Sequence, residues 1–311
     1  MPLRRWSQGN GLASLTRVST VPPQSYSLRS TNGTFVLRVG NQSARWEGLA
    51  LQLGFAPQMI GDQPSVHVLD LVKTIQPLLE GAPSLSLGTN PVIVIDPGHG
   101  GENAGAKSVV GNHYEKEFTL DWARRLQAIL AANNWRVYLT RNSDVDLPLS
   151  NRVEFAVRHK ADLFLSLHFN SVDRAPNEAG LETYCLTPAG MPSNLTRGAE
   201  EISTAFPNNA FDPQNLELAL EVHRAILRAT GQQDRGVRHA RFPGVLRGQQ
   251  EPAILIEGGY LSNAKEARQI SDPAFRQKLA EAVATALLDT NGAGRDTRIA
   301  AQETLEGSRS P

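Results

Sequence analysis

The feature that most constrains the fold is a regular alternation, from residue 92 onward, of short apolar runs and longer amphipathic segments. The run VIVID (92–96) is of the kind found in strands that are buried on both faces, and WRVYLT (135–140) and DLFLSLH (162–168) predict a second and a third strand. The segments between them repeat apolar residues every three or four positions, which predicts helices. Repeats of this length favour right-handed crossovers and therefore a doubly wound, mostly parallel twisted sheet with helices on both faces.

The same pattern continues to the end of the predicted domain, which we expect to span residues 92–290. GLETYCL and PAILIE (252–257) are predicted strands. The predicted helices are EKEFTLDWARRLQAILAANN (115–134), LSNRVEFAVRHKA, QNLELALEVHRAILRAT, which ends at Gly231, and DPAFRQKLAEAVATALLDT.

The regions outside this domain differ in composition. Residues 1–33 are polar and rich in turn residues, which indicates a leader or linker. TFVLRV and VLDLVKTIQPLL predict a strand and a helix, so we expect a small α+β unit over 34–83. We expect a linker at 84–91 and a disordered tail at 291–311.

Composition excludes several classes of protein. Lys plus Arg and Asp plus Glu each total 31, so the net charge is zero, and we expect no nucleic-acid partner. No apolar run is long enough to span a membrane, and no apolar segment follows the basic residues of MPLRRW, so no export signal is visible. The one cysteine, Cys185, excludes an internal disulfide, and we interpret it as a small buried apolar residue. We expect a monomer.

Four ionisable side chains are predicted at one rim of the sheet. In open α/β sheets the ligand crevice lies beyond the carboxyl ends of the strands. His99 follows the first strand, His168 ends the third, Glu257 ends the last, and Glu115 begins the helix after the first strand's loop. Two imidazoles and two carboxylates can form a catalytic zinc site, in which three ligands hold the metal and a further carboxylate transfers protons.

Each residue also has a simpler interpretation. The glycines around His99 could cradle a phosphate, although their spacing does not fit GxGxxG. Glu115 could favour a helix N-terminus, and His168 could be a hydrogen-bonded core residue. His113 and Glu117 are nearby competitors for the metal. The remaining histidines, which have no partner at ligand spacing, are interpreted as surface or packing residues: His67, His159, His223 and His239.

A resemblance to a known family rests on several motifs in order. VIVIDPGHGGENAGA, HYEKEFTLDWARRL, VYLTRNSD, NRVEFAV, ADLFLSLHFNS, GLETYCL, DRGVRHARFPGVLR and PAILIEGGYLSN together resemble the zinc-dependent N-acetylmuramoyl-L-alanine amidases over roughly residues 92–290. The resemblance implies that His99, Glu115 and His168 bind one zinc ion and that Glu257 is the general base. Asn170, in the S-x-H-x-N motif, would orient a ligand or the substrate, or would only favour a turn.

The resemblance also implies the reaction. It is hydrolysis of the amide bond between N-acetylmuramic acid and L-alanine in peptidoglycan, which places the protein in the periplasm or outside the cell. Two alternatives stay open: a zinc peptidase that acts on the stem peptide, and a non-catalytic cell-wall-binding protein. Some family members carry an insertion that covers the zinc until a protein activator removes it. The long connection at 188–213 could do this through Glu200 or Glu201, or it could be an ordinary surface loop.

Overall fold

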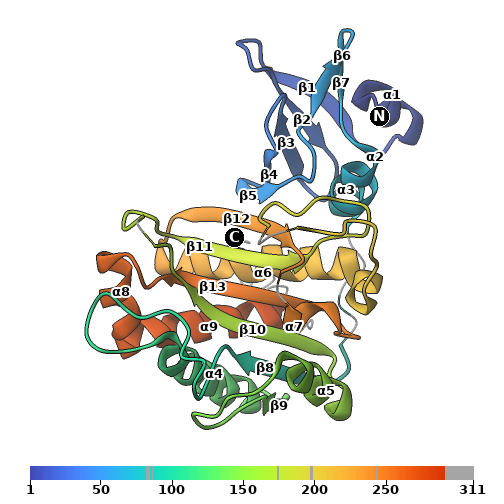
Figure 1. The fold of residues 1–311 in the computed structure, drawn as a ribbon. Coiled ribbons are helices and arrows are strands. Elements are labelled where there is room, and N and C mark those ends of the chain that lie inside the picture. The colour runs from blue at the N-terminus through green and yellow to red at the C-terminus, as the bar shows by residue number, and fades with distance from the viewer. Residues whose placement is uncertain (82–84, 86, 174, 197–198, 243, 291–311) are drawn as a thin grey trace, which may run out of the picture.

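The computed structural model describes residues 1–81, 85, 87–173, 175–196, 199–242 and 244–290 (Figure 1). Within these ranges one sheet of eleven strands runs through the molecule, in the order β1-β2-β3-β4-β5-β12-β11-β13-β10-β8-β9. The tail predicted at 291–311 and positions 84 and 86 of the predicted linker lie outside the described residues. The structure describes no helix that is long and apolar enough to cross a membrane.

The predicted strands and helices after residue 92 are present, and the α/β fold is confirmed. Four strands run parallel: β8 (Val92–Pro97), β9 (Arg136–Leu139), β10 (Leu163–Asn170) and β13 (Ala253–Tyr260). The helices are α4 (Glu115–Ala131), α5 (Leu149–His159), α6 (Asp212–Thr230), α7 (Gly244–Arg247), α8 (Ala264–Ser271) and α9 (Pro273–Thr290).

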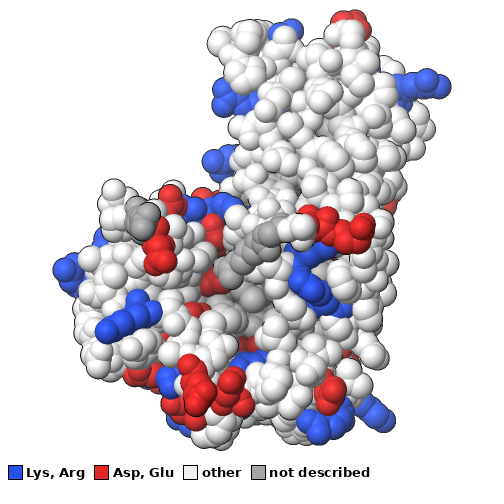
Figure 2. Space-filling model, viewed as in Figure 1, with Lys and Arg blue, Asp and Glu red and all other residues white. Residues whose placement is uncertain are grey.

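Helices cover the two faces of this sheet unequally. In the view of Figure 1, α6 and α9 lie behind β11 and β13, while α5 and α7 lie on the near side, toward one end of the strands. The larger core lies between the sheet and α4, α6 and α9, and the smaller one lies under α5 and α7. The near face is therefore open toward the carboxyl ends of β10 and β13. Figure 2 shows that the middle of this face is hollowed and that acidic side chains line the hollow.

Two central strands run against the parallel group. β11 (Leu181–Leu186) pairs with β13 antiparallel and with β12 (Asp234–Ala240) parallel. The connection from β10 to β11, residues 171–180, is too short for the helical crossover that a parallel return needs. β11 therefore starts at the rim where β10 and β13 end, and it finishes at the opposite rim.

The N-terminal region corrects one expectation. Residues 1–33 are not a leader or linker throughout, because they form α1 (Leu3–Asn10), β1 (Ser14–Ser19) and β2 (Ser25–Arg29). Tyr26 and Leu28 of β2 are buried, which supplies the reason for the strand. The following elements are β3 (Thr34–Arg38), β4 (Ser43–Trp46), β5 (Leu49–Gln52), β6 (Gln58–Ile60) and β7 (Gln63–Ser65), then the helical segments α2 (Val68–Asp70), η1 (Leu71–Ile75) and α3 (Gln76–Glu80).

The N-terminal unit is joined to the rest of the sheet. Leu51 of β5 is the Cα partner of Val237 in β12, and the Ala50 amide donates to the Asp234 carboxylate at 2.8 Å. Lys73 Nζ lies 3.0 Å from Asp212 Oδ2 at the start of α6. The unit therefore extends the sheet beyond β12.

Candidate metal centre

Three of the predicted residues converge at the rim where the parallel strands end. His99 lies just past β8, Glu115 is the first residue of α4, and His168 lies near the end of β10. Their ligand atoms all lie within 4.8 Å of one another. Glu115 is buried and the two histidines are half-buried, so the group opens to the surface through its imidazoles.

The carboxylate of Glu115 lies between the two imidazoles. Its Oε2 is 3.1 Å from Nε2 of His99, and its Oε1 is 2.8 Å from Nδ1 of His168. The other ring nitrogen of His99, Nδ1, lies 2.8 Å from Oδ1 of Asn103. An outer partner of this kind fixes the ring orientation of a metal-binding histidine. Two imidazoles and a carboxylate are the donor set of a site that could hold a metal ion.

The charges of the three groups are coupled. Burial would raise the pKa of Glu115, but hydrogen bonds from His168 and His99 outweigh it and hold that pKa below its usual value. Burial would lower the pKa of His99, but the Glu115 carboxylate outweighs it and raises that pKa. The carboxylate is thus kept ionised between two imidazoles, which is the protonation state that a metal ligand needs.

Two glycines leave room for these side chains. A Cβ on Gly98 would lie 2.3 Å from Cε1 of His168, and a Cβ on Gly105 would lie 2.6 Å from Oε2 of Glu115 and 2.6 Å from the His99 ring. Contacts this short require the side chain or the loop to move. The loop between β8 and α4 therefore needs glycine at both positions if the three side chains are to meet.

Glu257 lies next to this group. It is the Cα partner of His168 in the parallel pairing of β13 with β10. Partners on neighbouring strands point to the same face of a sheet, so the Glu257 side chain lies beside His168 on the open face. Glu257 is buried and is also the Cα partner of Glu182 in β11. His168, Glu257 and Glu182 thus form a row across three strands.

Asn170 belongs to the neighbouring polar cluster. Its Nδ2 donates to Oε2 of Glu182 at 3.1 Å, and Tyr184 donates to the same oxygen at 2.8 Å. Arg235 Nε donates to Oε1 of Glu182 at 2.8 Å. Burial would raise the pKa of Glu182, but the charge of Arg238 and the Arg235 hydrogen bond lower it. Glu182 and Arg235 were not predicted from the sequence. The sequence signal that could have identified them is a charged residue near the start of β11 and another near the start of β12.

The other residues considered as metal ligands bond away from His99 and His168. Glu117 lies 2.7 Å from Nδ1 of His113 and accepts from the Tyr114 amide at 3.0 Å, at the exposed start of α4. His223 is buried between Thr183 and Asp234, 3.0 Å from each, and so is a packing residue. Of the two glutamates in EKE, it is Glu115 that meets the histidines.

The predicted occlusion by Glu200 or Glu201 is wrong in this structure. The hypothesis needed the connection after β11 to start at the rim of His168, but β11 is antiparallel to β13 and ends at the opposite rim. Glu200 accepts from the Ser193 amide at 2.9 Å and lies 3.3 Å from Arg241. Glu201 is exposed and accepts from Ser203. Both side chains bond within their own region instead of reaching the metal group.

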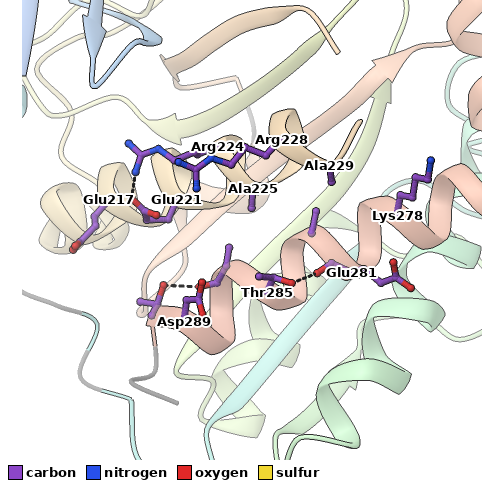
Figure 3. A pocket seen from close by; sticks show the side chains of 13 residues that line it. Glu217, Glu221, Arg224, Ala225, Arg228, Ala229, Lys278, Glu281, Thr285 and Asp289 are labelled. Carbon is purple, nitrogen blue, oxygen red and sulfur yellow. Dashed lines mark hydrogen bonds and ion pairs between the residues drawn. The ribbon is translucent and has the colours of Figure 1, made fainter. Parts of the chain in front are cut away.

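A groove on the opposite face of the sheet is separate from the candidate metal centre. It lies between α6 and α9, has a volume of about 730 Å³, and is lined by charged side chains over a floor of small residues (Figure 3). Glu217 and Glu221 stand at one end of its α6 wall, and Arg224 and Arg228 stand further along it. Glu221 and Arg224 pair with each other at 2.8 Å. The groove contains no histidine or cysteine.

Comparison with known proteins agrees with this geometry. A family model described as N-acetylmuramoyl-L-alanine amidase matches residues 93–289. The chain belongs to this family. AmiC of Escherichia coli is 32% identical over 241 residues, which cover 69% of this chain and 56% of that protein. AmiC of Neisseria meningitidis is 29% identical over 261 residues, which cover 73% of this chain and 62% of that protein. The chain thus spans less than two thirds of the length of these relatives.

Solved amidase structures share the fold of the matched region. The catalytic domain of CwlV from Bacillus (Paenibacillus) polymyxa has a TM-score of 0.53 and 34% identity, covering 64% of this chain and 97% of that one. AmiC2 of Nostoc punctiforme has a TM-score of 0.53 and 33% identity, covering 65% and 97%. In both cases nearly the whole of the solved chain is matched, so the similarity covers a complete amidase domain.

Proposed function

We propose that the protein hydrolyses the amide bond between N-acetylmuramic acid and L-alanine in peptidoglycan, with one zinc ion held by His99, Glu115 and His168. The observation that carries this proposal is the position of Glu257, directly beside His168 and on the same face of the sheet. A metal-binding group with an adjacent carboxylate has the composition of a hydrolytic zinc site. Family membership supports the choice of substrate.

Each residue of the site has a separate role in the proposed reaction. Bound zinc supplies an acidified water and polarises the carbonyl of the scissile amide. Glu257 accepts the proton from the attacking water and delivers it to the amine of L-alanine as that group leaves. Asn103 orients the His99 ring, and the ionised Glu115 completes the ligand set. The cluster around Glu182 keeps Asn170 at the edge of the open face, where the substrate would lie.

The metal is tested first. The purified protein should bind about one zinc ion per chain, and removal by a chelator should abolish hydrolysis that added zinc restores. His99→Ala and His168→Ala should each lose the metal. A matched control is His159→Ala, because His159 lies at the end of α5 and bonds the carbonyl of Phe155. Stoichiometric zinc in both ligand variants would contradict the assignment.

Product analysis separates the two candidate reactions. An amidase releases an intact stem peptide with a free L-alanine amine and leaves a free lactyl carboxylate on the sugar. A peptidase would shorten the stem peptide and leave the lactyl amide whole. Mass spectrometry of digested muropeptides distinguishes these products. Because peptidoglycan lies outside the cytoplasmic membrane, the proposed reaction places the protein in the periplasm or outside the cell; a protein activator stays a prediction.

A further inference from the structure

His99 has a backbone conformation that needs external support. Its φ is +62°, in the left-handed region, which costs roughly 1 kcal/mol or more for a residue other than glycine. Such a conformation persists where the surroundings hold it. Gly98 and Gly100 flank His99, so the local chain is permissive and the support has to come from contacts with other elements.

Two buried arginines bind the backbone around His99. Arg152 on α5 donates from Nη2 to the carbonyl oxygen of His99 at 2.8 Å and from Nη1 to that of Pro97 at 2.9 Å. Arg141 donates from Nε to the Pro97 carbonyl at 3.0 Å and from Nη2 to the Gly98 carbonyl at 2.9 Å. Both arginines are almost inaccessible to solvent. Three consecutive carbonyls are thus fixed from outside the loop.

Arg152 is itself fixed by a buried carboxylate. Its Nη1 lies 2.6 Å from Oδ1 of Asp96, and both side chains are nearly fully buried. Asp96 also accepts hydrogen bonds from Thr140 at 2.5 Å and from Ser166 at 2.9 Å. Ser166 is the Cα partner of Asp96 in the pairing of β10 with β8, and it precedes His168 by two residues. One carboxylate therefore links the strand before His99, the strand that carries His168, and α5.

We propose that the buried Asp96–Arg152 pair is a positioning device that preorganises His99 for the metal. The inference rests on the metal role proposed above. Arg152 binds the backbone of His99, so it acts through that residue and is not a ligand. A guanidinium is required because its planar fork reaches Asp96 and two carbonyls at once, which the single ammonium of lysine does not do. The pair explains why a charged residue interrupts the apolar strand β8.

The test compares two buried arginines. Arg152→Lys keeps the charge but loses the fork, and we expect zinc affinity to fall by about 10- to 100-fold, as for other outer partners of metal ligands. The control is Arg241→Lys. Arg241 is also buried and bonds the carbonyls of Pro188 and Met191 at 2.7 Å each, but it follows β12 at the opposite rim. That variant should lose stability and keep wild-type zinc affinity. Both affinities are measured by competition with a chromogenic chelator.

The outcomes separate the claims. Wild-type zinc affinity in a folded Arg152→Lys protein, or an equal loss in Arg241→Lys, overturns the positioning role. If Arg152→Lys does not fold, Ser166→Ala removes one hydrogen bond to Asp96 and should give a smaller fall in zinc affinity; no fall there also overturns the inference. A wild-type protein that binds no zinc overturns the proposed function and this inference with it. The results that overturn only the positioning role, from the Arg152→Lys, Arg241→Lys and Ser166→Ala variants, leave the proposed function intact.

Discussion

Glu257 and His168 are direct partners across β13 and β10, at the point where both strands reach the open face of the sheet. This relationship places a carboxylate beside an imidazole that we propose binds the metal, without any loop between them. Strands hold side chains more precisely than loops do, so the position of Glu257 relative to His168 is well defined. If Glu257 is the general base that we propose, the reaction should depend on the charge of its carboxylate and not on the shape of the side chain.

Glu257→Gln tests that dependence. Glutamine preserves the size and polarity of the side chain but accepts no proton from water. Turnover of peptidoglycan should drop by roughly two to four orders of magnitude, while zinc content stays at the wild-type level. Turnover is measured by release of soluble muropeptides, and zinc by atomic absorption. Near-normal turnover would mean that another group moves the proton, and Glu182, its partner on the other side, would be examined next.

Gly98→Ala tests the close approach of the β8 loop to His168. Because an added Cβ would lie 2.3 Å from the His168 ring, the ring or the loop has to move. We expect loss of zinc affinity and of activity with the fold retained. The control is Gly88→Ala, where an added Cβ meets nothing within 4 Å. Circular dichroism establishes folding, and zinc titration gives the affinity. Equal zinc affinity in the two variants would show that the loop yields to the added methyl group.

How much was predictable differs between the parts of the molecule. The strands at 92–96 and 162–168 were predicted because strands buried on both faces leave continuous apolar runs, and the edge strand at 135–140 was predicted from its β-branched and aromatic residues although most of it is exposed. The convergence of the three ligand candidates followed from the places of His99 and His168 at the ends of parallel strands and of Glu115 at the start of the helix after the first strand. The elements within 1–33 were not predicted, because short strands with one exposed face, such as SYSLR, give a weak signal among turn residues.

The direction of β11 was not predicted, and this omission led to the wrong placement of the connection at 188–213. Periodicity identifies β11 but does not say which way it runs, and its direction moved the connection at 188–213 to the opposite rim. The absence of a helix-forming segment in residues 171–180 was the available signal, because a parallel return needs one. Arg141 and Arg152 were missed for a different reason. Arg141 precedes polar residues and Arg152 follows polar residues, so the sequence around each suggests an exposed surface. Only the tertiary fold shows that both side chains are buried.

Glu200→Gln tests the placement of the connection at 188–213 at the rim opposite His168. Glu200 bonds Ser193 and Arg241 at the rim opposite His168, so removal of its charge should leave peptidoglycan hydrolysis unchanged. A small loss of thermal stability is expected, because the variant weakens a half-buried ion pair. The exposed Glu201→Gln serves as the control and should change neither quantity. A clear rise in hydrolysis by Glu200→Gln, measured on the same muropeptide assay, would revive the occlusion hypothesis.

His239 should make the fold sensitive to acid. It is buried in β12, and burial lowers the pKa of its imidazole from 6.5 to about 4, while a hydrogen bond with the Gln52 backbone raises it and Arg241 lowers it further. The unfolded chain therefore binds the proton first as the pH falls. The free energy of unfolding should decrease as the pH falls through 6.5 toward 4, and the difference in pKa corresponds to roughly 3 kcal/mol at completion.

His239→Gln removes the titration and isolates this contribution. Urea unfolding of wild type and variant is compared at about pH 7 and about pH 4.5, where wild type should lose roughly 2 kcal/mol more than the variant. Burial raises the pKa of Asp70 to about 6 and that of Glu251 to about 7, which acts in the opposite direction, but both groups are common to the two proteins and cancel in the comparison. His113→Gln, at an exposed position, is the matched control. Equal losses in wild type and His239→Gln would mean that the buried imidazole is protonated without disturbing the fold.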